Sequence, residues 1–320
     1  MNDTSPKRHA GIGAIARALD RLPAVKRLRA ERDALAAEVS RLSVGPFVPN
    51  GHFYSPFPSI SEVRGNEARL FPPAPRSLPG IDLREAEQLA LLDELRAHYD
   101  EQPFPQAQTP PRRYWFDNPM FGHSDAIFLY AMIRHARPRR LVEVGSGYSS
   151  AVTLDTNELF FGNGIDCTFI EPYPDTLHEL LRDTDASRVR ILPQPVQSVD
   201  LRVFEALGAN DILFIDSSHV AKVGSDVNHL IFEVLPRLRV GVYVHVHDIV
   251  YPFEYPPSWV YEGRAWTEAY LLRAFLAFND SFKVVLYPSF LATFHDALFA
   301  EQFPLCLRNT GGSIWLRRRA

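Results

Sequence analysis

The sequence predicts an α/β protein: a Rossmann-like sheet of seven strands, mostly parallel, with helices on both faces and a helical extension at the N-terminus. From Arg140 onward, strand-like segments alternate with helical ones, a pattern typical of a parallel sheet with right-handed crossovers. Two further strand-like segments follow the fifth, and their order suggests an antiparallel pair at the end of the sheet. With 320 residues, 46% of them hydrophobic, the chain can bury a full core.

The first region, residues 1–44, contains an amphipathic helix in the stretch "AVKRLRAERDALAAEVSRLSV". Its apolar residues recur at heptad spacing, although an arginine occupies one of these positions. About three heptads are marginal as an isolated helix, so two interpretations stay open. The helix packs on its own domain, or it pairs with a second copy as a short coiled coil, which would make the protein a homo-oligomer.

The second region, residues 45–113, is rich in proline and aromatic residues, as in "GPFVPNGHFYSPFPS". Over residues 45–80, repeated prolines exclude a regular helix or a central strand. Helical periodicity resumes over about residues 83–99. The third region, residues 114–320, opens with a helix and then carries the sheet. Its seven strand-like segments are, in order, "RLVEVGSG", "DCTFIEP", "RVRILPQ", "DILFID", "GVYVHVHDI", "FKVVLYPS" and "GGSIWLRR".

Composition and charge exclude several classes of partner. A net charge of −4 gives no general basic field, so we expect neither nucleic acid nor an anionic membrane as a partner. No run approaches the roughly 18 to 20 apolar residues of a membrane-spanning helix, and the N-terminal stretch "GIGAIARAL" lacks the features of a signal peptide. Only two cysteines are present, Cys167 and Cys306, which suits a reducing compartment. We therefore expect a cytoplasmic protein.

The turn after the first strand has the composition of a ligand-binding loop. In "LVEVGSGYSS", Gly145 and Gly147 allow a tight turn and close approach of a ligand to the main chain. A dinucleotide fingerprint would have a third glycine where Ser150 stands. Glu143 in the preceding strand favours a ligand that carries positive charge. Glu171, which follows the second strand in "FIEP", is placed to accept bonds from the hydroxyls of a ribose.

Acidic residues also follow the fourth and fifth strands. Asp216 and Asp248 stand at the carboxyl edge of the sheet, where ligands bind in open α/β sheets. Two converging carboxylates repel each other unless a cation lies between them or one is protonated, and such oxygen ligands suit Mg²⁺. His219 follows Asp216 by three residues; by itself this pair fits a helix cap beside an unrelated histidine as well as a metal ligand beside a general base. His247 precedes Asp248 and is a candidate partner behind the ligand.

Together, "VEVGSGYS", "FIEP", "FIDSSH" and "VHDI" at the ends of successive strands resemble the class I S-adenosylmethionine-dependent methyltransferases. The resemblance covers about residues 114–320. Within that superfamily the chain is similar to the metal-dependent small-molecule O-methyltransferases, including the macrocin and mycinamicin sugar enzymes. The resemblance implies S-adenosylmethionine and Mg²⁺, or another divalent cation, as cofactors, and a small-molecule or sugar acceptor.

The resemblance also implies roles for the residues of the strand ends. Gly145, Gly147 and Ser149 would contact the methionine part of the cofactor, with Glu143 near its amino group. Glu171 would hold the ribose. Gln197, in "PVQSVD", would contact the adenine.

For the reaction itself, the resemblance implies that Asp216 and Asp248 bind the cation and that His219 is the candidate base. Related enzymes often carry two adjacent ligands after the fifth strand, whereas Ile249 follows Asp248 here. The third protein ligand therefore stays open between Glu254 and His219.

The segment after Asp248 is rich in aromatic residues and prolines and forms either a lid over the acceptor or a cluster packed on the core. Its aromatic members are Tyr251, Phe253, Tyr255, Trp259 and Tyr261. Two other functions stay open at this point. One is a nucleotide-dependent oxidoreductase, which the missing third glycine and the strand count disfavour. The other is a non-catalytic scaffold in a biosynthetic assembly.

Overall fold

The structure is a computed structural model that describes residues 22–42 and 47–319. The stretch "GIGAIARAL", for which the sequence predicts no signal peptide, lies outside the described residues. By its internal contacts the chain divides into two compact units, residues 1–64 and 65–320, which are described separately.

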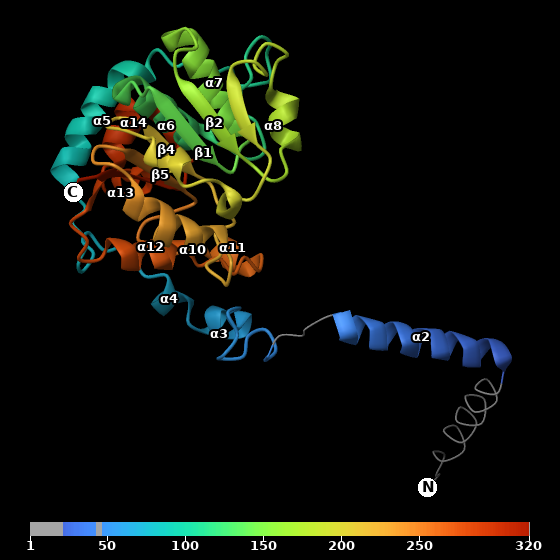
Figure 1. Cartoon of the computed structure of the whole chain (residues 1–320). Coiled ribbons are helices and arrows are strands. Elements are labelled where there is room, and N and C mark those ends of the chain that lie inside the picture. The colour runs from blue at the N-terminus through green and yellow to red at the C-terminus, as the bar shows by residue number, and fades with distance from the viewer. Residues whose placement is uncertain (1–21, 43–46, 320) are drawn as a thin grey trace. The chain divides into compact units, whose positions relative to one another are not determined.

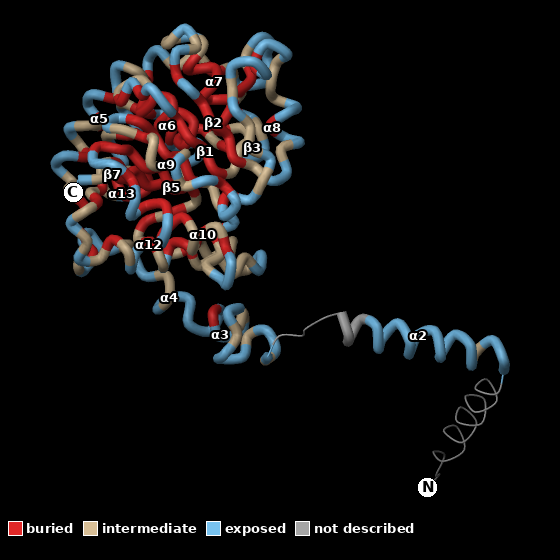
Figure 2. Tube along the Cα trace, in the orientation of Figure 1, coloured by how far each residue is buried: buried red, intermediate tan, exposed pale blue. Residues whose placement is uncertain are grey.

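In the first unit, helix α2 (Pro23–Leu42) confirms the helix that the heptad pattern predicts. Leu28 and Leu35, which belong to the apolar heptad positions, are exposed (Figure 2). A short helix, α3 (Ile60–Gly65), follows at the boundary of this unit. The expectation that no helix forms between residues 45 and 80 was wrong here, because residues 59–71 contain no proline. Among residues 22–38 and 47–64, only Val63 is buried. The first unit therefore has almost no core of its own in the part that is described.

The second unit is built on a seven-stranded sheet, as predicted. Its strand order is β3-β2-β1-β4-β5-β7-β6. The first five strands are parallel, whereas β7 runs antiparallel to both β5 and β6. The strands are β1 (Arg140–Val144), β2 (Asp166–Ile170), β3 (Val189–Leu192), β4 (Ile212–Ile215), β5 (Tyr243–His247), β6 (Phe282–Leu286) and β7 (Ser313–Arg318).

Helices surround this sheet (Figure 1). Every residue of β4 and β5 is buried, which requires that both faces of the sheet are covered. The α-helices are α4 (Glu67–Leu70), α5 (Glu85–Tyr99), α6 (His123–Ala136), α7 (Tyr148–Phe161), α8 (Asp175–Leu180), α9 (Arg202–Glu205), α10 (Asp226–His229), α11 (Pro257–Tyr261), α12 (Glu268–Leu276), α13 (Pro288–Phe294) and α14 (Asp296–Gln302). Shorter 3₁₀ and π turns complete the unit, at Val196–Ser198, Leu230–Val234, Leu235–Arg237 and Pro304–Leu307.

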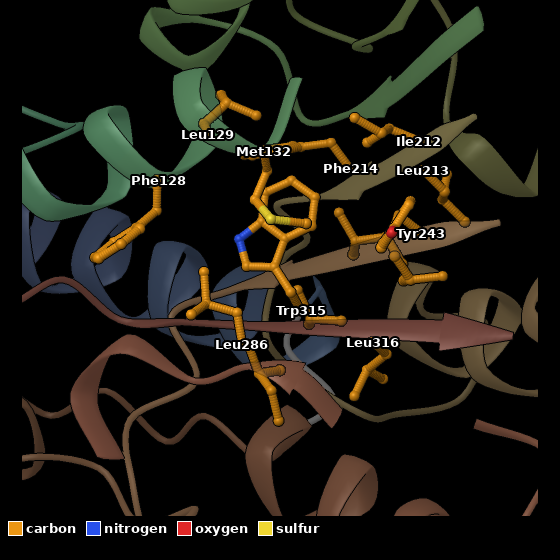
Figure 3. Close-up of a cluster of buried hydrophobic side chains, with 14 of the residues drawn as sticks. Phe128, Leu129, Met132, Ile212, Leu213, Phe214, Tyr243, Leu286, Trp315 and Leu316 are labelled. Atoms are coloured by element: carbon orange, nitrogen blue, oxygen red, sulfur yellow. The ribbon is translucent and has the colours of Figure 1, made fainter. Parts of the chain in front are cut away.

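The core lies between α6 and the middle of the sheet. In Figure 3, Leu129 and Met132 of α6 lie near Phe214 of β4 and Trp315 of β7, and all four side chains are fully buried. Nearly all of α6 is inaccessible, which explains why its sequence is apolar around most of its circumference rather than along one stripe.

No helix in the described ranges combines the length and the apolar character needed to cross a bilayer.

The strand order also sets the place of the site. Strands β2, β1, β4 and β5 are consecutive neighbours in the sheet. Because all four are parallel, their carboxyl ends meet at one edge, and the polar residues that follow them meet there too.

Candidate active site

The turn after β1 has one glycine that the fold requires. Gly145 has φ +80°, and a Cβ atom at this position would lie 1.8 Å from the carbonyl oxygen of Asp216. No side chain fits, because the backbone after β4 runs directly against this turn. Gly147 differs: its backbone is extended, and the nearest atom to an added Cβ, on Thr176, is 3.8 Å away. The loops that carry Gly145 and Asp216 are therefore in direct contact.

Glu143, at the end of β1, is completely buried beneath this turn. Its Oε1 atom accepts hydrogen bonds from the hydroxyls of Ser149 (2.6 Å) and Ser150 (2.8 Å). Its Oε2 atom has no partner among the described residues. Burial raises the pKa of Glu143 to about 8. Ser150, which replaces the third glycine of a dinucleotide fingerprint, also accepts the N–H of Gly147 (3.0 Å) and so supports the turn.

The structure brings Glu171 to the same edge, at the end of β2. Its two carboxylate oxygens accept the backbone N–H groups of Ser146 (3.2 Å) and Tyr173 (2.8 Å). Glu171 thus links the turns that follow β1 and β2. Gln197 lies further along this edge, where its side-chain amide donates to the carbonyl oxygen of Gly224 (2.8 Å).

Two cavities adjoin each other at these residues. The smaller, of about 450 Å³, contains Gln197. The larger, of about 880 Å³, contains Gly147 and Ser149. Both are lined by Gly145, Glu171, Asp216 and Ser217. Of the cofactor residues predicted from the sequence, Glu143 alone lines neither cavity, and it lies behind Ser149.

Asp216, His219 and Asp248 form the one group among the described residues whose side chains are arranged to hold a metal ion. One ligand atom from each lies within 4.8 Å of the others. The Nε2 atom of His219 is 3.3 Å from Oδ1 of Asp216 and 3.4 Å from Oδ2 of Asp248. His219 and Asp248 both adopt left-handed backbone conformations, with φ +59° and +55°. Such conformations are uncommon outside glycine and concentrate at functional sites.

A second carboxylate holds the other side of the His219 ring. Nδ1 of His219 lies 2.9 Å from Oε2 of Glu268, a side chain that is 2% exposed. The ring of Trp266 packs 4.3 Å from the imidazole, measured between ring centres. The pKa of His219 is raised to about 10: burial alone would lower it, but hydrogen bonds and charge attraction from Asp216 and Glu268 outweigh the burial.

The two histidines of β5 have different surroundings. His247 lines the larger cavity, with Nε2 3.7 Å from Oδ1 of Asp248. Burial acts to lower its pKa, yet the carboxylates of Asp216, Asp248 and Asp125 raise it overall. His245 lies deeper, stacked 4.1 Å from the ring of Phe214, and burial lowers its pKa well below the ordinary value. His245 is therefore a neutral core residue, whereas His247 reaches the site.

Glu254, the other candidate for the third ligand, is not part of this group. Its Oε1 atom accepts hydrogen bonds from the hydroxyl of Tyr270 (2.5 Å) and from the backbone N–H of Tyr255 (3.0 Å).

In the aromatic segment around Glu254, the side chains of Tyr251, Phe253 and Tyr255 are buried. The packing interpretation therefore holds for these three. Trp259, in contrast, lines the larger cavity together with Arg264 and Trp266.

Sequence reasoning missed Glu268, the residue with the most direct bond to His219. An acidic residue in the first turn of an apolar helix is an ordinary feature, because the helix dipole favours it. Nothing in "WTEAYLLRAFL" separates that role from a bond to a histidine 49 residues earlier.

Comparison with known proteins finds a family for the central part of the chain. Residues 142–249 match the family model described as "Methyltransferase domain". This stretch runs from β1 to just beyond Asp248 and so includes the glycine turn, Glu171 and the cluster of Asp216, His219 and Asp248. An uncharacterized protein of Archaeoglobus fulgidus is 40% identical over 175 residues, which cover 53% of this chain and 77% of that protein.

Several solved structures are similar at low sequence identity. An apo structure of CmcI is 19% identical, with 85% of this chain and 100% of that chain covered and a TM-score of 0.40. The SAH-bound methyltransferase PaMTH1 of Podospora anserina is 14% identical, with coverage of 76% and 99% and a TM-score of 0.40. The O-methyltransferase TomG of Streptomyces achromogenes, in complex with SAM, is 14% identical, with coverage of 75% and 92% and a TM-score of 0.38.

Proposed function

The chain belongs to the class I S-adenosylmethionine-dependent methyltransferases, and we propose that it methylates a hydroxyl group of a small-molecule or sugar acceptor with the help of a divalent cation. The observation that carries this proposal is the gathering of Asp216, His219 and Asp248 beside the glycine turn. The family assignment replaces the two alternatives considered from the sequence, an oxidoreductase and a scaffold.

The residues present fit the cofactor. S-adenosylmethionine supplies a methyl group on a positively charged sulfur, which leaves as a neutral thioether. The smaller cavity, between Glu171 and Gln197, would take the adenosine, with Glu171 at the ribose hydroxyls. The methionine part would lie along the main chain from Gly145 to Ser149, in the larger cavity.

The donor set also fits a hard or borderline divalent cation. Two carboxylates and one imidazole converge at the edge of the larger cavity. A cation bound there would lower the pKa of an acceptor hydroxyl, which is a poor nucleophile near neutral pH. Mg²⁺ and Mn²⁺ both accept such ligands.

In the proposed reaction the acceptor O–H bond and the methyl C–S bond break, and one O–C bond forms. The proton of the hydroxyl leaves to a base, either His219 or water. What this chain contributes is mainly alignment, since the sulfonium is already activated and the acceptor oxygen must approach the methyl group in line with the sulfur.

The wall of the larger cavity suggests the kind of acceptor. The guanidinium of Arg264 lies over the rings of Trp259 (4.6 Å) and Trp266 (4.9 Å), and all three residues line the cavity. Aromatic faces of this kind suit sugar rings and planar natural products. The acceptor would therefore lie against these rings with its hydroxyl toward Asp216 and Asp248.

The test combines cofactor binding with cation dependence. Calorimetry should detect binding of S-adenosylmethionine and its demethylated product. Methyl transfer to a panel of hydroxylated acceptors should fall at least tenfold after chelation, return with Mg²⁺ or Mn²⁺, and be lost in Asp248→Asn. Glu233→Gln, which changes an exposed carboxylate paired with Arg237, is the control. Transfer to hydroxyls that is insensitive to both chelator and Asp248→Asn would overturn the cation role.

A further inference from the structure

We propose that Glu268 is a positioning residue that orients the ring of His219, so that His219 binds the cation through Nε2 as the third protein ligand. This inference rests on the proposed function, because it requires a cation at Asp216 and Asp248. It decides between the two candidates that the sequence left open, and it assigns a role to a residue outside the matched family region.

The first step is the orientation of the imidazole. Its two nitrogens face opposite partners: Nδ1 lies 2.9 Å from Glu268, and Nε2 lies between Asp216 and Asp248. A buried carboxylate at 2.9 Å holds the proton on Nδ1, since the carboxylate can only accept. A cation bound between Asp216 and Asp248 would displace the proton from Nε2, and the lone pair of Nε2 would then be directed at that cation. A carboxylate behind a metal-binding histidine is the usual arrangement in metal sites.

The second step is that the backbone also holds His219 in place. Its carbonyl oxygen accepts the N–H groups of Thr267 (2.8 Å) and Glu268 (3.1 Å), at the start of α12. The hydroxyl of Thr267 in turn accepts the N–H of Ala221 (2.8 Å). The first turn of α12 thus contacts His219 through both backbone and side chain. These bonds stabilise the left-handed conformation of His219, which an unsupported loop residue would rarely adopt.

The third step concerns distance. Ligand atoms about 2.1 Å from one ion, at right angles to each other, lie about 3 Å apart. The separations of Nε2 from the two carboxylate oxygens, 3.3 and 3.4 Å, are close to that value. All three ligand atoms lie within 4.8 Å of one another, so a small closing movement would bring them onto one ion. An imidazole ligand would extend the range of suitable ions beyond Mg²⁺ to transition metals.

The experiment uses the full chain and Mn²⁺, whose binding is followed by electron paramagnetic resonance without any acceptor. In the wild type, electron spin echo modulation should show a directly bound imidazole nitrogen. This signal should disappear in His219→Asn. In Glu268→Gln, Mn²⁺ affinity should fall about 10- to 100-fold, the usual effect of removing a partner behind a ligand. Glu233→Gln is again the matched control.

The outcomes separate the two proposals. If the wild type does not bind Mn²⁺, the cation role in the proposed function fails. If it binds Mn²⁺ without a nitrogen signal, His219 is not a ligand, and the further inference fails while the proposed function stands. Unchanged affinity in a folded Glu268→Gln variant refutes the role of Glu268. If Glu268→Gln does not fold, Glu268→Asp is measured instead. Its shortened side chain would no longer reach Nδ1 of His219, so an Mn²⁺ affinity equal to that of the wild type would refute the role of Glu268.

Discussion

At the scale of single residues, Glu143 shows how the site is built at a cost to stability. It is a carboxyl group with no exposed surface, and its two serine partners satisfy only one of its oxygens. Burial disfavours the charged form, so the folded protein keeps Glu143 protonated to about pH 8. An unfolded chain would release that proton near the ordinary pKa of 4.5.

This difference predicts how stability changes with pH. Below about pH 4.5 the folded and unfolded states both hold the proton, and Glu143 contributes no pH dependence. Between about 4.5 and 8 only the folded state holds it, so its contribution to the free energy of unfolding falls as pH rises and then levels off. At about 1.4 kcal/mol per pH unit, the loss reaches a few kcal/mol.

Glu143→Gln should remove this loss. We expect the variant to gain stability relative to the wild type as pH rises from 5 to 8, with a constant difference above about pH 8. Urea unfolding of the cofactor-free protein at a series of pH values measures it. Glu233→Gln, which changes an exposed carboxylate, is measured alongside as the control. A flat or inverted difference for Glu143→Gln would show that Glu143 ionises normally in the folded state.

The site residues that the sequence identified directly follow strands, whereas the residue that it missed reaches the site through tertiary packing. Gly145, Glu171, Asp216 and Asp248 stand directly after strands, and the rule that parallel strands end at one edge is enough to bring them together. Glu268 reaches the site through the packing of a helix on a loop, and no local pattern reports such packing. Glu254 was a candidate by its position near Asp248, yet its carboxylate is held by Tyr270.

At the scale of secondary structure elements, helix α7 connects the site to the rest of the unit. It begins at the glycine turn, and its Asp155 is part of a buried ionic network. Arg113 bonds to Asp155 (2.8 Å), Asp185 (2.6 Å) and Glu158 (2.9 Å), and its side chain is 1% exposed. The network therefore joins α7 to the segment before α6 and to the loop after α8.

Arg113→Met should destabilise the protein by about 3 to 5 kcal/mol, because it removes the main cation beside the buried Asp155 and Asp185 and leaves Asp155 only the longer contact to Arg182 (3.6 Å). Arg182→Met is the matched control, since Arg182 is 30% exposed and pairs mainly with the partly exposed Glu158. We expect that variant to lose about 1 kcal/mol or less. Thermal and urea unfolding measure both. Equal losses in the two variants would contradict a special role for the buried arginine.

Elements were easier to predict than their contacts. Seven strands were visible because each is a short apolar run bounded by turn residues, and alternation with helices indicates parallel pairing. The ionic network of Arg113 could not be predicted from the sequence, because its partners lie 42 to 72 residues away in the chain. In the aromatic segment, sequence alone could not separate burial from exposure, since aromatic side chains serve both a core and a binding surface.

At the scale of the whole molecule, the site belongs to one of the two compact units. All the residues assigned to it, from Glu143 to Glu268, lie within residues 65–320, and so does the entire sheet. Before that unit, within residues 22–38 and 47–64, only Val63 is buried. The contribution of residues 1–64 to the site is therefore expected to be small, and pairing of α2 with a second copy stays a prediction.

A fragment of residues 65–320 tests this division. We expect the melting temperature of the fragment to lie within a few degrees of that of the full chain. Its Kd for the demethylated cofactor product should lie within about twofold of the full chain's value, because no residue of the site is removed. If α2 pairs between copies, sedimentation should show a larger assembly for the full chain than for the fragment. Substituting the exposed Leu28 and Leu35 by serine in the full chain is the control, and should reduce its assembly to that of the fragment. A fragment that fails to fold or to bind the product would show that residues 1–64 are part of the working enzyme.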